Sequence, residues 1–158
     1  MLQLLQNGIA NHLLSILNEY KIPKEKISFE ITELMYSQDE KRANEIMESL
    51  EKENIHFSLD SYGTGYSNTA SIMHHQYAEI KLDRSLIIDA EKDKTNLISL
   101  KHLINMIKEE GITVLAEGIE KKETASILES LGCDLMQGFY YARPMPEEQF
   151  IAFLKEKA

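Results

Sequence analysis

The chain has 158 residues, of which 43% are hydrophobic and 27% charged, and this composition indicates one folded domain rather than a disordered segment. The formal net charge of −9 argues against a surface for nucleic-acid polymers or anionic membranes, although one small anionic ligand held by a metal remains possible. The single cysteine excludes an intrachain disulfide, and because the sequence has neither a basic signal-peptide start nor an apolar run of about 20 residues, we expect a cytoplasmic chain without a membrane segment.

Hydrophobic periodicity predicts helices and strands that alternate along the chain. The predicted helices cover residues 9–20, about 37–53, 66–74, 93–110 and 121–131, and Pro146 opens a last one. The predicted strands cover residues 27–32, 55–60, 78–83, 112–116 and 135–140. This alternation is typical of βαβ units with a parallel sheet, and the single apolar stripe of each helix indicates that the helices cover that sheet.

Charged and amide side chains collect at the ends of the predicted strands, which lie on one rim in parallel α/β folds. These candidates are Glu30, Glu33, Asp60, Lys81, Asp83, Glu117, Glu120 and Gln137. Several carboxylates in one cleft repel each other, and a divalent metal relieves that conflict. Because no Cys or His lies at a strand end, the donors favour Mg²⁺, Mn²⁺ or Ca²⁺ over zinc, and two such ions would suit hydrolysis of a phosphate ester.

A purely structural explanation stays open for part of this set, because carboxylates also cap helices and bind turn amides. Glu33 and Glu120 fit that explanation well. Glu30 and Lys81 fit it less well, since both lie inside predicted strands. Asp60 comes directly before a glycine-containing turn, where either explanation applies.

Five motifs cover nearly the whole chain in a specific order. They are Phe29-Glu-Ile-Thr-Glu33, Leu59-Asp-Ser-Tyr-Gly-Thr-Gly-Tyr-Ser67, Ile80-Lys-Leu-Asp83, Ala116-Glu-Gly-Ile-Glu120 and Gln137-Gly-Phe-Tyr-Tyr-Ala-Arg-Pro144. This series resembles the successive motifs of EAL domains, which are bacterial cyclic di-GMP phosphodiesterases with a modified (β/α)₈ barrel. The resemblance implies that residues 1–158 form a single EAL-like domain, the C-terminal portion of the family barrel.

The resemblance also implies roles for individual residues. The implied metal ligands are Glu30, Asp60, Asp83 and Glu117, the implied catalytic residues are Lys81 and Glu117, and the implied substrate-binding or loop-support residues are Glu33, Ser61, Glu120 and Gln137. Asp60 would be shared between two Mg²⁺ or Mn²⁺ ions, and Lys81 would orient the attacking water or the phosphate. The implied reaction is attack of water on one phosphodiester bond of cyclic di-GMP, which gives the linear dinucleotide.

Two departures from the family pattern bear on activity. The Glu-Ala-Leu motif and the Asn-containing strand that follows it are absent, so we expect an incomplete α/β barrel that lacks its first strands and two metal ligands. Ser61 stands where the family usually has a second consecutive Asp, and serine lacks the charge that helps to hold a second divalent ion. We therefore expect weak or absent metal binding and impaired catalysis in this chain.

Three functions follow as hypotheses. The first is a degenerate EAL-type signalling domain that acts as a regulatory or interaction module. The alternatives are an active phosphodiesterase completed by missing N-terminal strands and a cyclic di-GMP receptor that binds without cleaving. We also expect a homodimer, because an opened barrel has two free sheet edges and would expose interior Val, Ile and Leu side chains, with Leu13 and Leu17 of helix 9–20 at the contact.

Overall fold

The computed structural model describes residues 6, 8–32, 40–64 and 77–157 of the chain. Its centre is a five-stranded sheet in which the strands lie side by side in chain order. All four strand pairs are parallel, as the alternation of helices and strands predicts. The strands are β1 Ser28–Thr32, β2 His56–Tyr62, β3 Glu79–Leu82, β4 Thr113–Ala116 and β5 Leu135–Met136.

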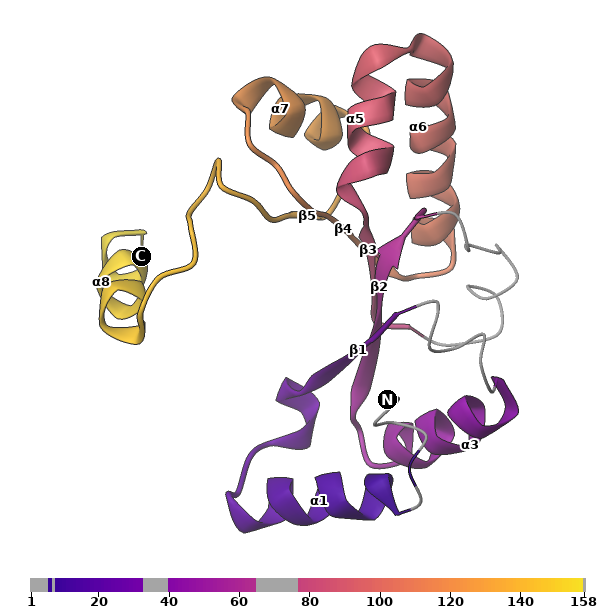
Figure 1. The fold of residues 1–158 in the computed structure, drawn as a ribbon, viewed down its shortest axis with the longest axis vertical. Coiled ribbons are helices and arrows are strands. Elements are labelled where there is room, and N and C mark those ends of the chain that lie inside the picture. Colours follow the sequence, from indigo (N-terminus) through magenta and orange to yellow (C-terminus); the bar gives the residue numbers. More distant parts are fainter. Residues whose placement is uncertain (1–5, 7, 33–39, 65–76, 158) are drawn as a thin grey trace.

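The helices connect these strands (Figure 1). They are α1 Ile9–Glu19, the short 3₁₀ helix η2 Lys24–Lys26, α3 Glu40–Glu51, α5 Arg84–Lys92, α6 Lys94–Glu109, α7 Lys122–Ser130 and α8 Glu147–Lys157. The predicted helix over 66–74 lies outside the described residues. Among the described residues, no helix is both long and apolar enough to cross a membrane.

Helix α5 was not predicted from the sequence, where only a helix over 93–110 was expected. It forms because Asp83 caps it: the carboxylate accepts a hydrogen bond of 2.8 Å from the backbone N–H of Ser85. Ile87 and Ala90 then anchor its inner side in the core. The extended backbone of Asp93 separates α5 from α6.

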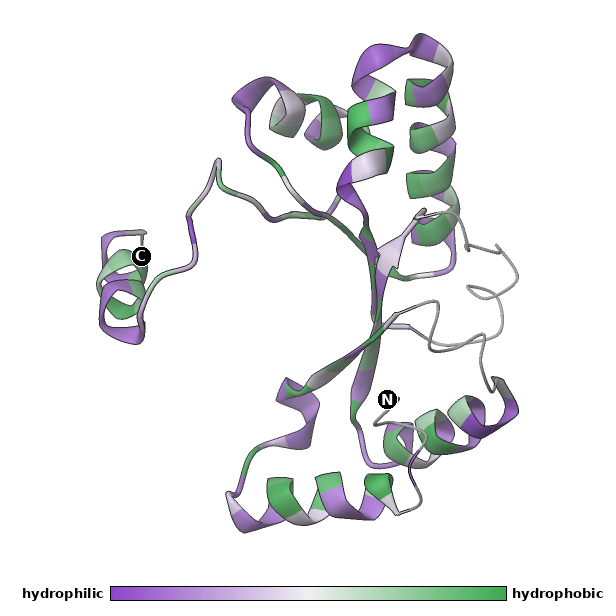
Figure 2. Cartoon of the chain, viewed as in Figure 1, coloured by the Kyte–Doolittle hydropathy of each residue, from purple (hydrophilic) through white to green (hydrophobic). Residues whose placement is uncertain are grey.

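One face of the sheet is apolar and buried. Because side chains alternate between the two faces of a strand, every second residue contributes to this face. Its residues, each at most 1% exposed, are Ile31, Phe57, Leu59, Ile80, Leu82, Val114 and Ala116. Helices other than α8 turn hydrophobic sides toward the core (Figure 2), and the predicted inner residues of α3 and α6 are in it, with Met47, Leu50, Ile104 and Ile107 fully buried.

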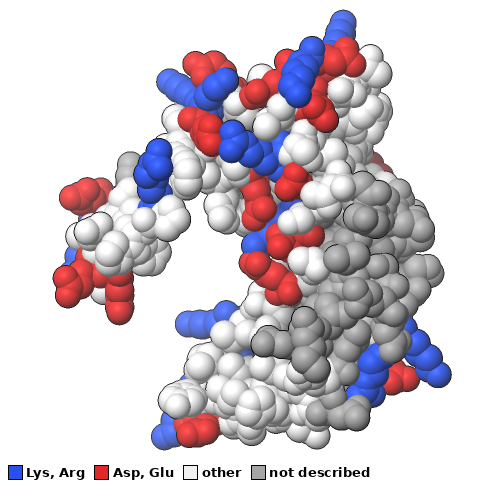
Figure 3. Space-filling model, in the orientation of Figure 1, with Lys and Arg blue, Asp and Glu red and all other residues white. Residues whose placement is uncertain are grey.

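The opposite face of the sheet is mainly polar. The alternating positions that face away from the core are Glu30, Ser58, Asp60, Glu79, Lys81, Thr113 and Leu115. Figure 3 shows acidic and basic side chains gathered on the hollowed side of the molecule, toward α8. The expectation that the open side exposes interior Val, Ile and Leu side chains is wrong for the described strands, because this face carries the charged strand positions and its Leu115 is only 9% exposed.

The two terminal helices differ in how they pack. Leu17 of α1 is only 7% exposed, and Leu13 packs against the same core, next to α3. This corrects the prediction that Leu13 and Leu17 form a contact surface for a second copy, because both side chains pack against the core of the same chain. By contrast, α8 stands apart on the open side of the sheet (Figure 1), and its Phe150, Ile151 and Leu154 are 44–49% exposed.

Lys108 and Asp134 tie the loop before β5 to the rest of the fold. The ammonium of Lys108 donates to the carbonyl of Gly132 at 2.6 Å and to Asp134 Oδ1 at 2.7 Å. The other oxygen of Asp134 accepts from the backbone N–H of Val114 at 3.0 Å, which is a bond across to β4. Burial alone would raise the pKa of Asp134, but the bonds from Lys108 and Val114 outweigh it and hold that pKa below its ordinary value.

We predict that Asp134→Ala lowers the free energy of unfolding by about 1–2 kcal/mol at neutral pH, because the backbone N–H of Val114 on β4 loses its charged acceptor. A carboxylate with a lowered folded pKa stabilises the fold fully above its unfolded pKa of about 3.9. The stabilisation is lost as the pH falls through the lower folded value. Urea unfolding at several pH values should therefore show the difference between the variant and the wild type shrinking below about pH 4.

The matched control is Asp89→Ala, which removes an exposed i,i+3 pair with Lys92. Such a surface pair contributes about 0–1 kcal/mol. Equal losses in the two variants, or a loss in Asp134→Ala that does not change with pH, would contradict the assigned role of Asp134.

Candidate functional site

The parallel hydrogen-bond ladder continues past the strand ends and fixes the backbone there. The backbone N–H of Asp83 donates to the carbonyl of Tyr62 at 3.1 Å, and that of Glu117 donates to Leu82 at 3.1 Å. The N–H of Gln137 donates to Ala116 at 2.9 Å. Three of the predicted site residues thus follow one another across the carboxyl rim of the sheet, as the sequence predicted.

A β-bulge lies at Asp60 and Ser61. Leu59 pairs with Ile80 and Tyr62 pairs with Leu82, so β2 holds one residue more than β3 over this stretch. Ser61 accommodates it with a left-handed φ of 58°, a conformation that costs a non-glycine residue roughly 1–3 kcal/mol. The turn predicted to start after Asp60 is thus delayed, and β2 extends to Tyr62. Bulges of this kind re-aim side chains next to functional sites.

Lys81 is the buried charge of the site, with a side chain that is only 10% exposed. Its ammonium forms an ion pair with Glu30 on β1 and lies 3.8 Å from Glu117 Oε1. Burial tends to lower the pKa of Lys81, but the hydrogen bond and charge of Glu30 outweigh it, with further help from Glu117 and Asp60. The net effect is a raised pKa, so Lys81 is charged at neutral pH.

Glu117 experiences the other acidic groups of the rim. Its pKa is raised, first by burial and then by the negative charge of Asp60, whereas Lys81 acts in the opposite direction. Glu30 and Asp83 raise it further. The fold therefore brings Asp60, Glu30 and Asp83 close enough to Glu117 to raise its pKa, with the ammonium of Lys81 acting against them.

The outer predicted residues are held by contacts of their own. Asp83 lies after the end of β3 and caps α5, so one of its oxygens is already engaged. Glu120 forms an ion pair of 2.8 Å with Arg84, and the stem of Arg84 packs against Gly118, which has a φ of 71°. Arg84 was not singled out from the sequence, although its position directly after Asp83 and its charge opposite to that of Glu120 were the available signals.

Gln137 lies beyond the fifth strand, which corrects the predicted extent of 135–140. The strand ends at Met136, and the following turn is closed by hydrogen bonds to the loop before α7: Ile119 donates to the carbonyl of Gln137, and Tyr140 donates to that of Ile119, both at 3.0 Å. These two hydrogen bonds take the place of further pairing between this segment and β4. Glu33 lies outside the described residues.

The donor set fits a hard divalent cation in chemistry but not in arrangement. Carboxylates that raise the pKa of a neighbour favour an added positive charge. Within the described ranges, however, no three Asp, Glu, His or Cys side chains are placed to share an ion. The metal-binding assignments of Glu30, Asp60, Asp83 and Glu117 stay predictions.

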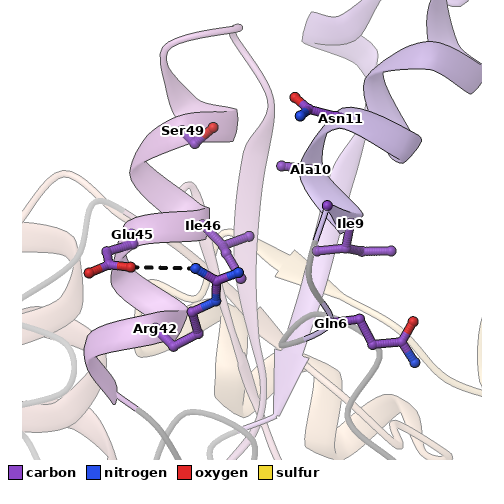
Figure 4. A pocket seen from close by; sticks show the side chains of 9 residues that line it. Gln6, Ile9, Ala10, Asn11, Arg42, Glu45, Ile46 and Ser49 are labelled. Atoms are coloured by element: carbon purple, nitrogen blue, oxygen red, sulfur yellow. Dashed lines mark ion pairs between the residues drawn. The ribbon is translucent and has the colours of Figure 1, made fainter.

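A separate cavity of about 210 Å³ lies between α1 and α3, away from these residues. Figure 4 shows that Arg42, Glu45 and Ile46 line it from α3, while Ile9 comes from α1. The guanidinium of Arg42 pairs with Glu45 at 3.6 Å. None of the predicted site residues lines this cavity.

A family model for the EAL domain matches residues 2–144. The chain belongs to the EAL domain family. Among the curated relatives, the cyclic di-GMP phosphodiesterase RocR of Pseudomonas aeruginosa is 28% identical over 151 residues, which are 96% of this chain and 38% of RocR. This EAL chain thus spans well under half of that relative's length.

Solved structures agree with this assignment. The EAL enzyme Bd1971, in a form bound to cAMP and cyclic di-GMP, is similar with a TM-score of 0.90 and 25% identity. The match covers 96% of this chain and 40% of the Bd1971 chain. BlrP1 of Klebsiella pneumoniae, as a manganese and cyclic di-GMP complex, is similar with a TM-score of 0.82 and 26% identity. The match covers 88% of this chain and 35% of the BlrP1 chain. The fold is an incomplete EAL barrel of the TIM-barrel type.

We predict that Gly138→Ala destabilises the Gln137 loop. A Cβ on Gly138 would overlap the backbone carbonyl and nitrogen of Ile119, and backbone atoms cannot move aside as a flexible side chain can. Because overpacking of this kind costs about 1–3 kcal/mol, the melting temperature should fall by several degrees. Gly132→Ala is the control: it also perturbs a glycine near β5, but a Cβ there would come no closer than 3.8 Å to Lys108. Its φ of 84° imposes strain without a clash, so a larger loss in Gly132→Ala would contradict the proposed close approach.

Proposed function

We propose that this chain is a cyclic di-GMP signalling domain of the EAL phosphodiesterase family whose own catalytic capacity is impaired. It would act as a regulatory or interaction module. The observation that carries the proposal is the rim of the sheet, where Lys81 is buried beside Glu30 and Glu117 within the electrostatic reach of Asp60. An acidic rim with one fixed ammonium is suited to a phosphate-containing ligand held together with divalent cations.

Each residue would act from its place in the fold. Glu30, Asp60, Asp83 and Glu117 would have to move closer together to hold the cations, because the described residues do not place three of them around one ion. A bound Mg²⁺ or Mn²⁺ would polarise a phosphoryl oxygen and lower the pKa of its water. The ammonium of Lys81 would orient that water or a phosphate oxygen, since its stem is held by β3. Glu120, through Arg84, would hold the loop that carries Glu117.

Two features support impairment. Ser61 occupies the bulge at which the EAL motif usually has a second Asp, so the rim lacks one carboxylate. The sheet of the described residues also ends at β1 on one side and at β5 on the other, so the ligand-holding rim is open. Glu30, on the edge strand β1, is consequently 54% exposed as a side chain. An exposed ligand loses more conformational freedom when it binds a cation.

We predict that the isolated chain does not hydrolyse cyclic di-GMP above the rate of its Glu117→Ala variant, with either Mg²⁺ or Mn²⁺ present. Loss of a well-placed metal removes several kcal/mol of transition-state stabilisation, which is a rate factor of about 10³ or more. Chromatographic detection of the linear dinucleotide at high enzyme concentration measures this. Clear turnover by the wild-type chain that the Glu117→Ala variant lacks would show that the chain is an active enzyme.

The second candidate function is an active phosphodiesterase completed by further strands. It is favoured by the intact Glu30, Asp60, Lys81, Asp83 and Glu117 and by the open edges of the sheet. Co-expression with the first β/α units of an EAL domain tests this alternative: activity that appears only with both pieces, and not with Glu117→Ala, would support it. Equilibrium dialysis with cyclic di-GMP tests the third candidate, a receptor that binds without cleaving.

We propose that the chain self-associates as a homodimer, through α8 rather than through α1. The apolar residues of α1 are used within the core, whereas Phe150, Ile151 and Leu154 leave an apolar side of α8 uncovered. The exposed Phe139 and Tyr141 precede this helix in the chain, and the guanidinium of Arg143 lies over the Phe139 ring. Apolar surface of this kind favours association when it is contiguous.

We predict that Ile151→Glu together with Leu154→Glu shifts the chain toward the monomer of 18.2 kDa. The charged side chains would have to be buried in the contact, which is unfavourable. Light scattering coupled to size exclusion at micromolar concentration measures the mass. Ile98→Glu is the control, since Ile98 is equally exposed at 49% but lies on α6. A wild-type chain that is already monomeric, or a shift caused equally by Ile98→Glu, would refute the α8 contact.

A further inference from the structure

The ammonium of Lys81 lies among the carboxylates at the rim of the sheet, where a positive charge reduces their mutual repulsion. Lys81 contacts carboxylates from two other elements: Glu30 on β1 and Glu117 in the loop after β4. Asp60 on β2 also acts on its charge. A positive group shared among carboxylates from neighbouring strands has the same electrostatic effect as a bound metal ion, because it removes the repulsion among them.

The position of this ammonium is determined by the backbone. Lys81 lies in the middle of β3, with Glu79 to Leu82 paired to residues of β4 on one side. Its side chain is 10% exposed, so the ammonium has little freedom to leave for solvent. Glu30 is the more accessible partner, because its side chain is 54% exposed at the edge of the sheet.

A cation that enters from solvent must therefore compete with Lys81. To bind Glu30 and Glu117 it has to break the ion pair of Lys81 with Glu30 and then lie close to an ammonium of like charge. Burial strengthens that repulsion, since the low local dielectric screens it poorly. Within the described residues no three Asp, Glu, His or Cys side chains are placed to share an ion, so a cation would have to draw Glu30 away from Lys81 to gather its ligands.

We propose that Lys81 is an internal counter-ion that competes with divalent cations for Glu30 and Glu117. In this chain the acidic rim is partly neutralised without metal, and metal affinity is weak because the ammonium must be displaced from Glu30. The inference rests on the proposed function for the identity of the cation, but it concerns binding rather than hydrolysis.

The test is calorimetric titration of Mn²⁺ into the whole chain and into Lys81→Met, which keeps an unbranched apolar stem nearly as long as that of lysine and removes the charge. We expect Lys81→Met to bind Mn²⁺ at least about tenfold more tightly, which corresponds to about 1.4 kcal/mol. Adding Glu30→Gln to Lys81→Met should reverse most of the gain. Unchanged or weaker Mn²⁺ binding in Lys81→Met would overturn the proposal.

Lys92→Met is the matched control. Lys92 is an exposed cation on α5 that is paired with Asp89 rather than with Glu30 or Glu117. If the gain arose from net charge alone, Lys92→Met would tighten Mn²⁺ binding as much as Lys81→Met does, and that result would overturn the proposal. A gain confined to Lys81→Met supports a competition at the ammonium itself.

A measurement on the wild-type chain keeps the proposal testable if Lys81→Met does not fold. The ¹⁵N resonance of the Lys81 ammonium should move during titration with Mg²⁺, as its hydrogen bond to Glu30 is lost. A resonance that stays in place while calorimetry shows Mg²⁺ binding would overturn the competition. Hydrolysis of cyclic di-GMP by the wild-type chain would refute the impaired function but leave this binding result unaffected.

Discussion

The alternation of side chains along parallel strands is the constraint on which the rest of this structure depends. Parallel pairing of β1 to β4 in one register places apolar residues on one face of the sheet, where the helices bury them. The same register places Glu30, Lys81 and the residues near them on the other face. A shift of one residue in any strand would exchange its two faces, so the core and the acidic rim are specified together.

The energetic consequences of this division differ between the two faces. Burial of large apolar side chains from the strands, α3 and α6 stabilises one face and needs no hydrogen-bond or ion-pair partner for each residue. On the other face, each charge depends on specific neighbours. Lys81 has Glu30 and Glu117, and removal of one partner would leave a buried ammonium poorly compensated. The polar face is therefore the less tolerant of substitution.

The strand ends show how local rules act within this frame. Asp83 is both a rim residue and the cap of α5, and these roles are compatible because a carboxylate has two oxygens. Ser61 adopts a left-handed conformation at the β-bulge, where β2 holds one extra residue beside Asp60. Gly138 lets the Gln137 loop approach the backbone of Ile119 closely. Each of these three features positions the backbone at the rim of the sheet and contributes little to the apolar core.

The amino-acid sequence by itself determined the alternation of helices with strands, the parallel sheet, the EAL family and the set of charged residues at the strand ends, because hydrophobic periodicity and motif spacing are local properties. Only the tertiary structure decided that the open face is polar, that Leu17 is buried, that the fifth strand ends at Met136 and that Arg84 binds Glu120. It also decided that Lys81 joins Glu30 to Glu117, two residues that are 87 positions apart in the chain. Such contacts depend on which strands pair and in which register, and pairing over that distance leaves no local signal in either segment.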